Sequence, residues 1–340
     1  MDIGIDLGTA SVLVYVKNKG IVLSEPSVVS IDKNSGKLLK VGKEAQNMLG
    51  RTPGNIQAVR PLKDGVISQY EITFKMLQHF LKKAGAGQLI KPRVIVCVPS
   101  GITEVEERAV YDASIQAGAK RVYLIEESIA AALGAEIDIS LPKGNMIIDI
   151  GGGTTDIAIL SMGGIVASES VRVGGDRFDE AIIKYVKKKY NILIGERTAE
   201  EVKKKIGCVW TKDDEDEQEI EVKGRCLIEG LPKIIRINSQ EVLEALEEPI
   251  TAIIEAICEV LERIPPELVM DVSKNGIIIT GGGAQIYGID KLVTNVTSIP
   301  SKVADDPLHC VIKGVGKALN NINNIPEGVV NISRSRLNRY

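Results

Sequence analysis

The chain has 340 residues, 44% of them hydrophobic and 26% charged, and its formal net charge is −3. This composition is that of a soluble globular protein rather than a disordered or fibrous one, and the length favours two domains. The small negative charge argues against nucleic acid as a principal partner.

Cysteine usage and the N-terminus indicate the compartment. The five cysteines lie far apart without metal-ligand spacing, so we expect reduced core residues in a cytoplasmic protein. The opening MDIGIDLGTA predicts a strand at once, so we expect no signal peptide, and no apolar run approaches the ~20 residues of a spanning helix. The cysteines are Cys97, Cys208, Cys226, Cys258 and Cys310.

Strand-like and helix-like segments alternate along the chain, which predicts an α/β fold. Near the start, two short aliphatic runs predict a hairpin that turns at Gly8-Thr9-Ala10. A second such pair lies within the run IDIGGGTTDIAIL at 148–160, where it flanks the three glycines. Further strands are expected over 20–32, 93–99 and 275–280, and helices over 72–85, 103–119 and 247–264.

Two stretches carry the signature of a helix N-terminus. Thr103 with Glu106 fits a capping box, and Gly118 suits the C-terminal end of the same helix. Thr198 with Glu201 repeats the signature later in the chain. We therefore expect helices to begin just after both threonines.

The two glycine hairpins form an internal repeat. GIDLGTASVLVYV near the start resembles IDIGGGTTDIAIL, and their aspartates Asp6 and Asp149 lie almost half the chain apart. Two similar halves, each offering an Asp-Gly hairpin, would face one another across a cleft.

The chemistry of these hairpins suits a polyphosphate. Glycine lets backbone N–H donors approach phosphate closely, whereas Asp6 and Asp149 would repel it unless a hydrated Mg²⁺ lay between. A third glycine turn at 280–288 could contact the nucleoside, and no Walker-type motif occurs. The hydroxyls available as further donors are those of Thr9, Ser11, Thr154 and Thr155.

Together these loops resemble the actin, Hsp70 and sugar-kinase superfamily, with phosphate loops at 4–16 and 147–160 and an adenosine loop at 279–288. The resemblance narrows to the MreB family of bacterial actins and spans residues 2 to about 320. The segments that carry it are GIDLGTA, SEPSVV, RTPGNI, RPLKDGVI, KPRVIVCVPSGIT, LIEES, NMIIDIGGGTTDIAIL, VGGDRFDEAI, LIGERTAEEVK, PPEL and TGGGA.

This resemblance implies a two-domain actin-like ATPase fold with duplicated RNase H-like cores around a nucleotide cleft. Domain I would comprise 1–142 and 316–340, with a small subdomain at about 31–61. Domain II would comprise 143–315, with its own small subdomain at about 181–249.

The resemblance also implies ATP and Mg²⁺ as ligands, with Asp6 and Asp149 holding the metal through water. Glu200 and Lys203 share one helical face, which the family uses for ribose and base, although the spacing equally suits a surface ion pair. The residues matched to nucleotide contacts are Gly8, Thr9, Ala10, Ser11, Gly151, Gly152, Gly153, Thr154, Thr155, Gly174, Gly175, Glu200, Lys203, Gly281, Gly282, Gly283 and Ala284.

For hydrolysis, Glu127 matches the family residue that orients or activates the attacking water, and Thr154 matches its partner. A helix N-terminal charge would explain Glu127 equally well, and physics alone does not separate it from Glu126. Two departures from the family's pattern bear on the rate of hydrolysis. The family commonly has Asn where Ser11 stands and Pro where Ser128 stands.

The implied function is an ATP-dependent filament, peripheral on the inner face of the cell membrane, that guides cell-wall synthesis and maintains rod shape. Its partners would be further copies of itself in paired protofilaments, an anionic membrane surface and membrane proteins of the elongation machinery. Leu89 and Ile90, flanked by cations, are the candidate membrane loop, or else two ordinary residues leading into a strand. The alternatives are a sugar kinase, for which no acceptor motif is found, and a chaperone, which would need a further peptide-binding domain.

Overall fold

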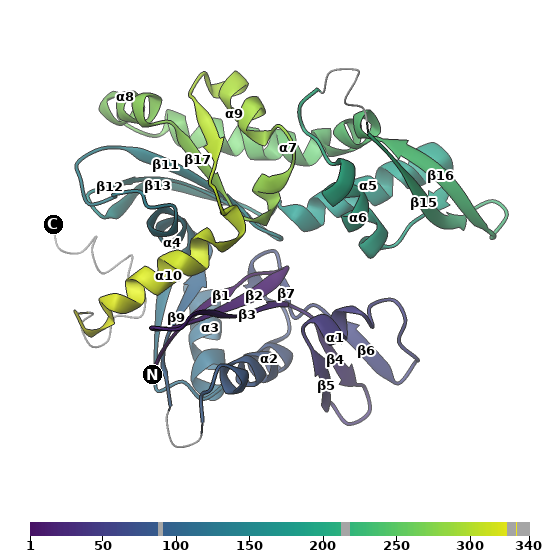
Figure 1. Cartoon of the computed structure of the whole chain (residues 1–340), viewed down its shortest axis with the longest axis horizontal. Coiled ribbons are helices and arrows are strands. Elements are labelled where there is room, and N and C mark those ends of the chain that lie inside the picture. The colour runs from purple at the N-terminus through teal and green to yellow at the C-terminus, as the bar shows by residue number, and fades with distance from the viewer. Residues whose placement is uncertain (88–90, 212–217, 325–330, 332–340) are drawn as a thin grey trace.

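The computed structural model describes residues 1–87, 91–211, 218–324 and 331. Its N-terminal part contains a five-stranded sheet in the order β10-β9-β1-β2-β3 (Figure 1). β1, β2 and β3 form an antiparallel meander, and β9 and β10 add parallel to β1. The strands are β1 (Asp2–Leu7), β2 (Ser11–Val16), β3 (Gly20–Pro26), β9 (Arg93–Val98) and β10 (Arg121–Glu126).

A second five-stranded sheet, in the order β13-β12-β11-β17-β18, repeats that topology. Again three antiparallel strands are followed by two parallel ones. The internal repeat predicted from the sequence is thus a repeat of the whole sheet. The strands are β11 (Asn145–Ile150), β12 (Thr155–Ser161), β13 (Gly164–Val171), β17 (Ile277–Thr280) and β18 (Ser301–Val303).

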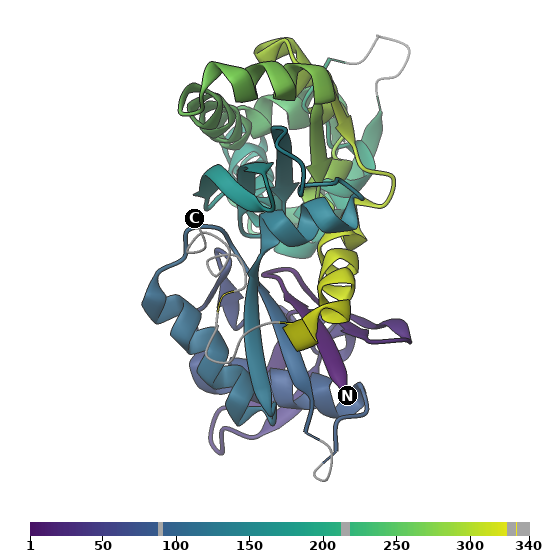
Figure 2. The same ribbon diagram turned by 90° about the vertical axis from the view of Figure 1, so that its left-hand side faces the viewer.

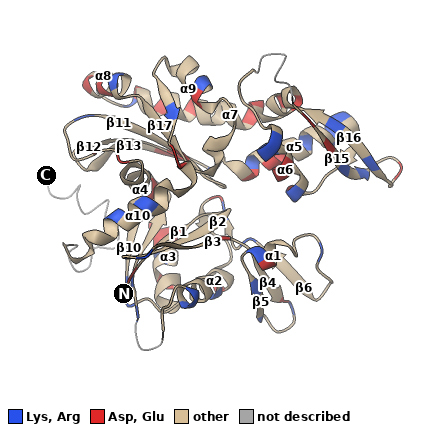
Figure 3. Ribbon diagram, viewed as in Figure 1, with Lys and Arg blue, Asp and Glu red and all other residues tan. Residues whose placement is uncertain are grey.

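Two smaller sheets extend from the same side of the two halves (Figure 1). The first consists of β4 (Val29–Asp32), β5 (Leu38–Val41) and β6 (Ile56–Val59), with α1 (Lys43–Gln46) beside it. The second consists of β14 (Ile192–Leu193), β15 (Glu219–Cys226) and β16 (Pro232–Asn238). Charged residues are dense on α5, α6 and the β15–β16 ribbon, whereas the ribbons of the large sheets are mostly uncharged (Figure 3).

The helices cover the sheets, and two of them lie between the halves (Figures 1 and 2). α4 and α10 cross so closely that a Cβ on Gly314 would lie 1.7 Å from the Ala130 carbonyl oxygen. Both helices share one apolar cluster with residues from each large sheet. The helices are α2 (Tyr70–Lys83), α3 (Glu104–Gln116), α4 (Glu127–Gly134), α5 (Gly175–Tyr190), α6 (Glu196–Ile206), α7 (Ser239–Glu262), α8 (Pro266–Asn275), α9 (Ile289–Thr297) and α10 (Cys310–Asn320).

The helix boundaries test the capping predictions. Thr103 does cap α3, since its side chain accepts from the Glu106 N–H and Glu106 reciprocates. The prediction for Thr198 is wrong, because α6 begins at Glu196 after an N-cap at Gly195 and Thr198 lies inside the helix. The long helix expected over 247–264 is α7, which begins earlier, at Ser239.

The predicted domain limits stay a prediction; the one between 315 and 316 falls inside α10, a single continuous helix. All five cysteines are free, and four of them are buried as expected, whereas Cys258 is only half-buried. None of the helices in the described part of the chain is long and apolar enough to cross a lipid bilayer. Leu89 and Ile90, the predicted membrane loop, lie outside the described residues.

Candidate nucleotide site

The turns of the two repeated hairpins are in direct contact. Each is closed by a backbone hydrogen bond, from the Gly8 N–H to Ser11 (3.1 Å) and from the Gly151 N–H to Thr154 (2.8 Å). A Cβ on Gly152 would lie 2.6 Å from the Cβ of Ala10, so only glycine allows this approach. The two predicted phosphate loops therefore meet, as the repeat implied.

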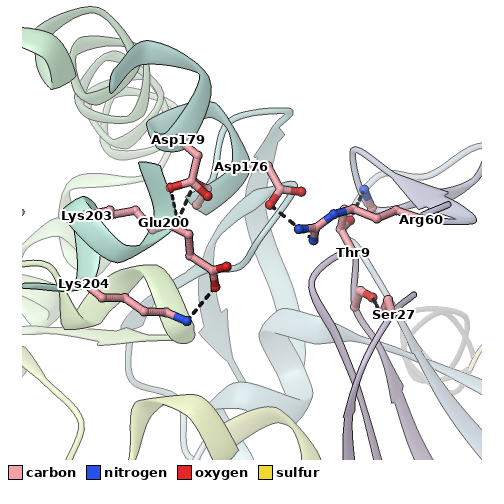
Figure 4. A network of polar contacts seen from close by, with 11 residues as sticks. Thr9, Ser27, Arg60, Asp176, Asp179, Glu200, Lys203 and Lys204 are labelled. Carbon is pink, nitrogen blue, oxygen red and sulfur yellow. Dashed lines mark hydrogen bonds and ion pairs between the residues drawn. The ribbon is translucent and has the colours of Figure 1, made fainter. Parts of the chain in front are cut away.

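A serine that sequence reasoning missed supports the first turn from behind. The Ser27 hydroxyl donates to the Gly8 carbonyl oxygen (2.5 Å), and the Ser27 N–H donates to Ala10 (3.0 Å). Figure 4 shows Ser27 beside Thr9. Because these two bonds occupy the turn's carbonyls, Ser27 holds the backbone of the first loop in place.

The N-terminus of α5 packs on the second turn. The Gly175 N–H donates to Gly151 (3.0 Å) and the Asp176 N–H to Gly152 (2.8 Å). These N–H groups are therefore occupied by the loop, while the positive end of the helix dipole still favours an anion nearby. The structure thus places the predicted Gly174-Gly175 loop against the second phosphate loop.

The helical pair predicted for ribose and base is engaged with neighbouring side chains here. Lys203 Nζ donates to the Gly175 carbonyl oxygen (2.8 Å) and pairs with Asp179 (2.9 Å), while Glu200 accepts from Lys204 (2.5 Å) (Figure 4). Burial opposes ionisation of Glu200, but the hydrogen bond from Lys204 leaves its pKa below the ordinary value. Nucleotide contact by this pair stays a prediction.

The third glycine turn lies on the end of β11. A Cβ on Gly283 would lie 2.4 Å from Ile150 Cγ2, and the Gly281 N–H donates to Pro307 (2.9 Å). The turn therefore lies directly behind the second phosphate loop. The predicted adenosine-loop residues Gly281, Gly282, Gly283 and Ala284 all belong to this turn and its short 3₁₀ helix.

Thr154, the predicted catalytic threonine, is covered by the other half of the molecule. The short hairpin of β7 (Leu62–Lys63) and β8 (Val66–Ile67) turns at Gly65. The Gly65 N–H donates to Thr9 Oγ1 (2.9 Å), and a Cβ there would lie 2.8 Å from Thr154 Cγ2. One turn thus contacts both phosphate loops.

Four carboxyls gather behind the loops: Asp6, Glu127, Asp149 and Asp156. Asp149 and Asp156 are cross-strand partners in β11 and β12, and Glu127 begins α4. Thr280 Oγ1 donates to Asp149 Oδ1 (2.6 Å), and the Ser100 N–H donates to Asp156 Oδ1 (2.6 Å). Asp156 Oδ2 is buried and makes no hydrogen bond of good geometry in the described structure, although the Ser170 and Thr154 hydroxyls are near enough to act on this carboxyl.

Burial raises the pKa values of all four carboxyls. The pKa is raised to about 7 for Asp6 and Asp156 and to about 6 for Asp149, where the Thr280 bond opposes the rise. For Glu127, burial and then the charge of Asp156 raise the pKa well above its usual range. The principal charges acting on these groups, within the described residues, are other carboxyls.

Such a cluster suits a cation. No lysine or arginine of the described residues acts appreciably on these four carboxyls, so they would repel one another when ionised. The described residues contain no group of three or more His, Cys, Asp or Glu side chains arranged to hold a metal ion directly. This arrangement is compatible with the predicted hydrated Mg²⁺, since Mg²⁺ usually keeps several waters.

Sequence reasoning missed Ser27, Gly65, Ser100 and Asp156. Asp156 had a visible signal, since it follows the glycine loop in the motif that was singled out. The others lie in loops whose approach to the site depends on the tertiary fold.

Comparison with solved structures defines the class of protein. The fold matches MreB5 of Spiroplasma citri bound to ADP, with a TM-score of 0.89, 42% identity, and 95% of this chain and 98% of that chain covered. It also matches the MamK double helical filament, with a TM-score of 0.79, 24% identity, and 95% and 99% covered, which supports the fold alone. The chain has an actin-like fold.

The family model described as MreB/Mbl protein matches residues 1–327. The chain is 53% identical over 327 residues to the cell shape-determining protein Mbl of Bacillus subtilis (strain 168), covering 96% of this chain and 98% of that protein. It is 52% identical over 324 residues to the cell shape-determining protein MreB of Escherichia coli (strain K12), with 94% and 93% covered. The chain belongs to the MreB/Mbl family.

Proposed function

We propose that this chain binds ATP with Mg²⁺ between its two halves and polymerises into a cytoskeletal filament that determines rod cell shape. The observation that carries the proposal is the contact of two glycine turns in front of a buried cluster of carboxyls. Backbone N–H groups and hydroxyls of both turns would bind the phosphates. The related MreB5 was solved with ADP and with AMPPNP, which supports nucleotide as the ligand.

Asp6 and Asp149 would hold Mg²⁺ through its water shell, and the metal would neutralise charge on the phosphates. Glu127 would accept or align the proton of the attacking water, and Thr154 would orient that water. The remaining work of the site is positioning, since phosphoryl transfer needs little covalent chemistry from the protein. We therefore propose slow hydrolysis coupled to assembly, not a metabolic reaction.

Cell shape enters the proposal through the relatives, whose names describe cell shape-determining proteins. We extend this role to the chain as guidance of cell-wall synthesis, through membrane proteins of the elongation machinery. The filament would lie in the cytoplasm on the inner face of the membrane. The proposed membrane contact is Leu89 and Ile90 with the cations around them.

The free energy of this membrane contact predicts how membrane binding depends on filament assembly. Burying Leu89 and Ile90 contributes roughly 3–6 kcal/mol, and each nearby cation roughly 1 kcal/mol on an anionic leaflet. The freedom lost on docking offsets much of this, so a monomer would bind marginally and a filament by avidity. The double variant Leu89→Ser/Ile90→Ser should polymerise normally but fail to sediment with anionic liposomes. Equal sedimentation of variant and wild-type filaments would refute this loop.

The main test is ATP-dependent sedimentation of the purified chain. We expect ATP with Mg²⁺ to give pelletable filaments above a critical concentration, visible by electron microscopy, and EDTA to abolish them. Phosphate should be released without any acceptor. The proposal is overturned by a chain that does not bind ATP, or by ATP-dependent phosphorylation of a sugar.

A further inference from the structure

The two repeated hairpins differ at one buried position. In the first, Asp6 of β1 faces Leu13 of β2, whereas in the second Asp149 of β11 faces Asp156 of β12. Leu13 is 2% exposed and Asp156 is fully buried. The hairpin architecture therefore accepts an ordinary core leucine here, and the duplication alone does not explain a carboxyl.

A buried carboxyl is costly unless its oxygens are hydrogen-bonded. Asp156 Oδ1 accepts from the Ser100 N–H at 2.6 Å, while Oδ2 makes no hydrogen bond of good geometry in the described structure, although the Ser170 and Thr154 hydroxyls lie close enough to lower the pKa of the carboxyl. Burial of this kind, retained at an unfavourable position, is typical of functional sites. Asp156 is joined to the rest of the site through Ser100.

Ser100 connects Asp156 to the helix that carries Glu127. The hydroxyls of Ser100 and Ser128 lie 3.0 Å apart, and both serines are buried. Ser100 follows β9 and Ser128 follows β10, two parallel strands whose carboxyl ends meet at one edge. The bonds thus run from β12, through the loop after β9, into the first turn of α4.

We propose that Asp156, Ser100 and Ser128 form a positioning network that fixes Glu127 for the hydrolysis step. The Ser100–Ser128 bond anchors the first turn of α4, and the Asp156 carboxyl holds the backbone of Ser100. This inference rests on the proposed function, because only an ATPase needs an oriented water.

The electrostatics agree with the geometry. Burial raises the pKa of Glu127 first, and Asp156 is the charged group that raises it most, ahead of Asp6 and Asp149. Asp156 therefore lies within electrostatic reach of Glu127, as expected if the hydrogen bonds through Ser100 and Ser128 join the two parts of the site.

The first test is Asp156→Asn, which keeps the acceptor for the Ser100 N–H and removes the charge. We expect kcat for phosphate release to fall about tenfold or more while KM and nucleotide affinity change less than about twofold. The charge-assisted bond to the Ser100 N–H becomes a weaker neutral one, so Glu127 should be held less precisely. An unchanged kcat, or a loss that appears in KM instead, overturns the network.

The second test is a double-mutant cycle on the serine pair. Ser100→Ala, Ser128→Ala and the double variant remove the same hydroxyl–hydroxyl bond, so all three should lose kcat to a similar extent. Ser114→Ala is the matched control, since Ser114 is a buried helical serine that bonds the Val110 carbonyl oxygen away from the site (2.8 Å). Additive losses, or an equal loss in the control, contradict the proposal.

ATP hydrolysis by the wild-type chain distinguishes a failure of the positioning network from a failure of the proposed function. A wild-type chain that hydrolyses ATP while every variant matches it refutes the positioning network alone. A wild-type chain that binds ATP but never hydrolyses it refutes the hydrolysis part of the proposed function and the network with it. Melting temperatures measured alongside identify any variant whose loss reflects unfolding.

Discussion

Arg60 and Asp176 form an ion pair, with 3.9 Å between Nη1 and Oδ1, that joins the loop after β6 to the first turn of α5 (Figure 4). A second pair of reversed polarity lies next to it, where Asp64 Oδ2 is 3.8 Å from Arg177 Nη2. Each half of the molecule thus contributes one cation and one anion. Both pairs lie beside the loops that meet at the candidate site.

We expect these pairs to slow opening of the cleft and hence nucleotide release. Partly exposed ion pairs contribute up to about 1 kcal/mol, so Arg60→Gln should speed release of a fluorescent ATP analogue up to about fivefold. Salt screens such pairs, so the difference from wild type should shrink at high ionic strength. Stopped-flow displacement at two salt concentrations measures it.

The matched control is Arg236→Gln. Arg236 pairs with Glu221 across the β15–β16 ribbon at 3.2 Å, away from the cleft. Its loss should leave the release rate unchanged at either salt concentration. A salt-independent effect of Arg60→Gln would show that the ion pair is not the cause.

The contact between the phosphate loops predicts a methyl-swap experiment. Gly152→Ala would place a Cβ 2.6 Å from that of Ala10, and over-packing of this kind costs about 1–3 kcal/mol. We expect nucleotide affinity to fall about tenfold or more, because the loops must separate. Ala10→Gly in the same chain should restore part of it by removing the opposing methyl. Isothermal titration measures all three affinities.

Gly54→Ala serves as the comparison, since a Cβ there meets nothing within 4 Å. This variant should bind nucleotide like wild type. If Gly152→Ala also binds like wild type, the contact between the loops is not maintained in the nucleotide-binding state.

The sequence predicts most of this architecture because its signals are local and repeated. The glycine turns, the strands beside them and the topological repeat all follow from short motifs. The neighbours of Lys203 could not be predicted from short motifs. Asp179 and the Gly175 carbonyl reach Lys203 only through the packing of α5 against α6. The network from Asp156 to Ser128 was missed for the same reason, as its members lie on three separate segments.

Two threonines with the same local signature give the next prediction. Thr103 caps α3, whereas Thr198 lies within α6 after Gly195. Thr103→Ala should therefore lower the free energy of unfolding by about 1 kcal/mol, because it removes a cap. Thr198→Ala should change it by less than about 0.5 kcal/mol, since alanine suits a helix interior. Urea denaturation of both variants decides the matter, and equal losses would contradict the assignment of the two helix starts.

The buried carboxyls predict how stability without nucleotide depends on pH. Burial raises the pKa of Asp156 to about 7, while an unfolded aspartate titrates near 4, so the folded state binds more protons between these values. Stability from this group is complete below about pH 4 and is lost as pH rises through about 7. Asp156→Asn removes that loss, so the variant should gain stability relative to wild type as pH rises from about 5 to about 8. Thermal melts of both proteins across this range, with EDTA and no nucleotide, measure the difference. A difference that is constant with pH would mean that Asp156 is ionised in the folded chain throughout, stabilised by hydrogen-bond donors beyond Ser100.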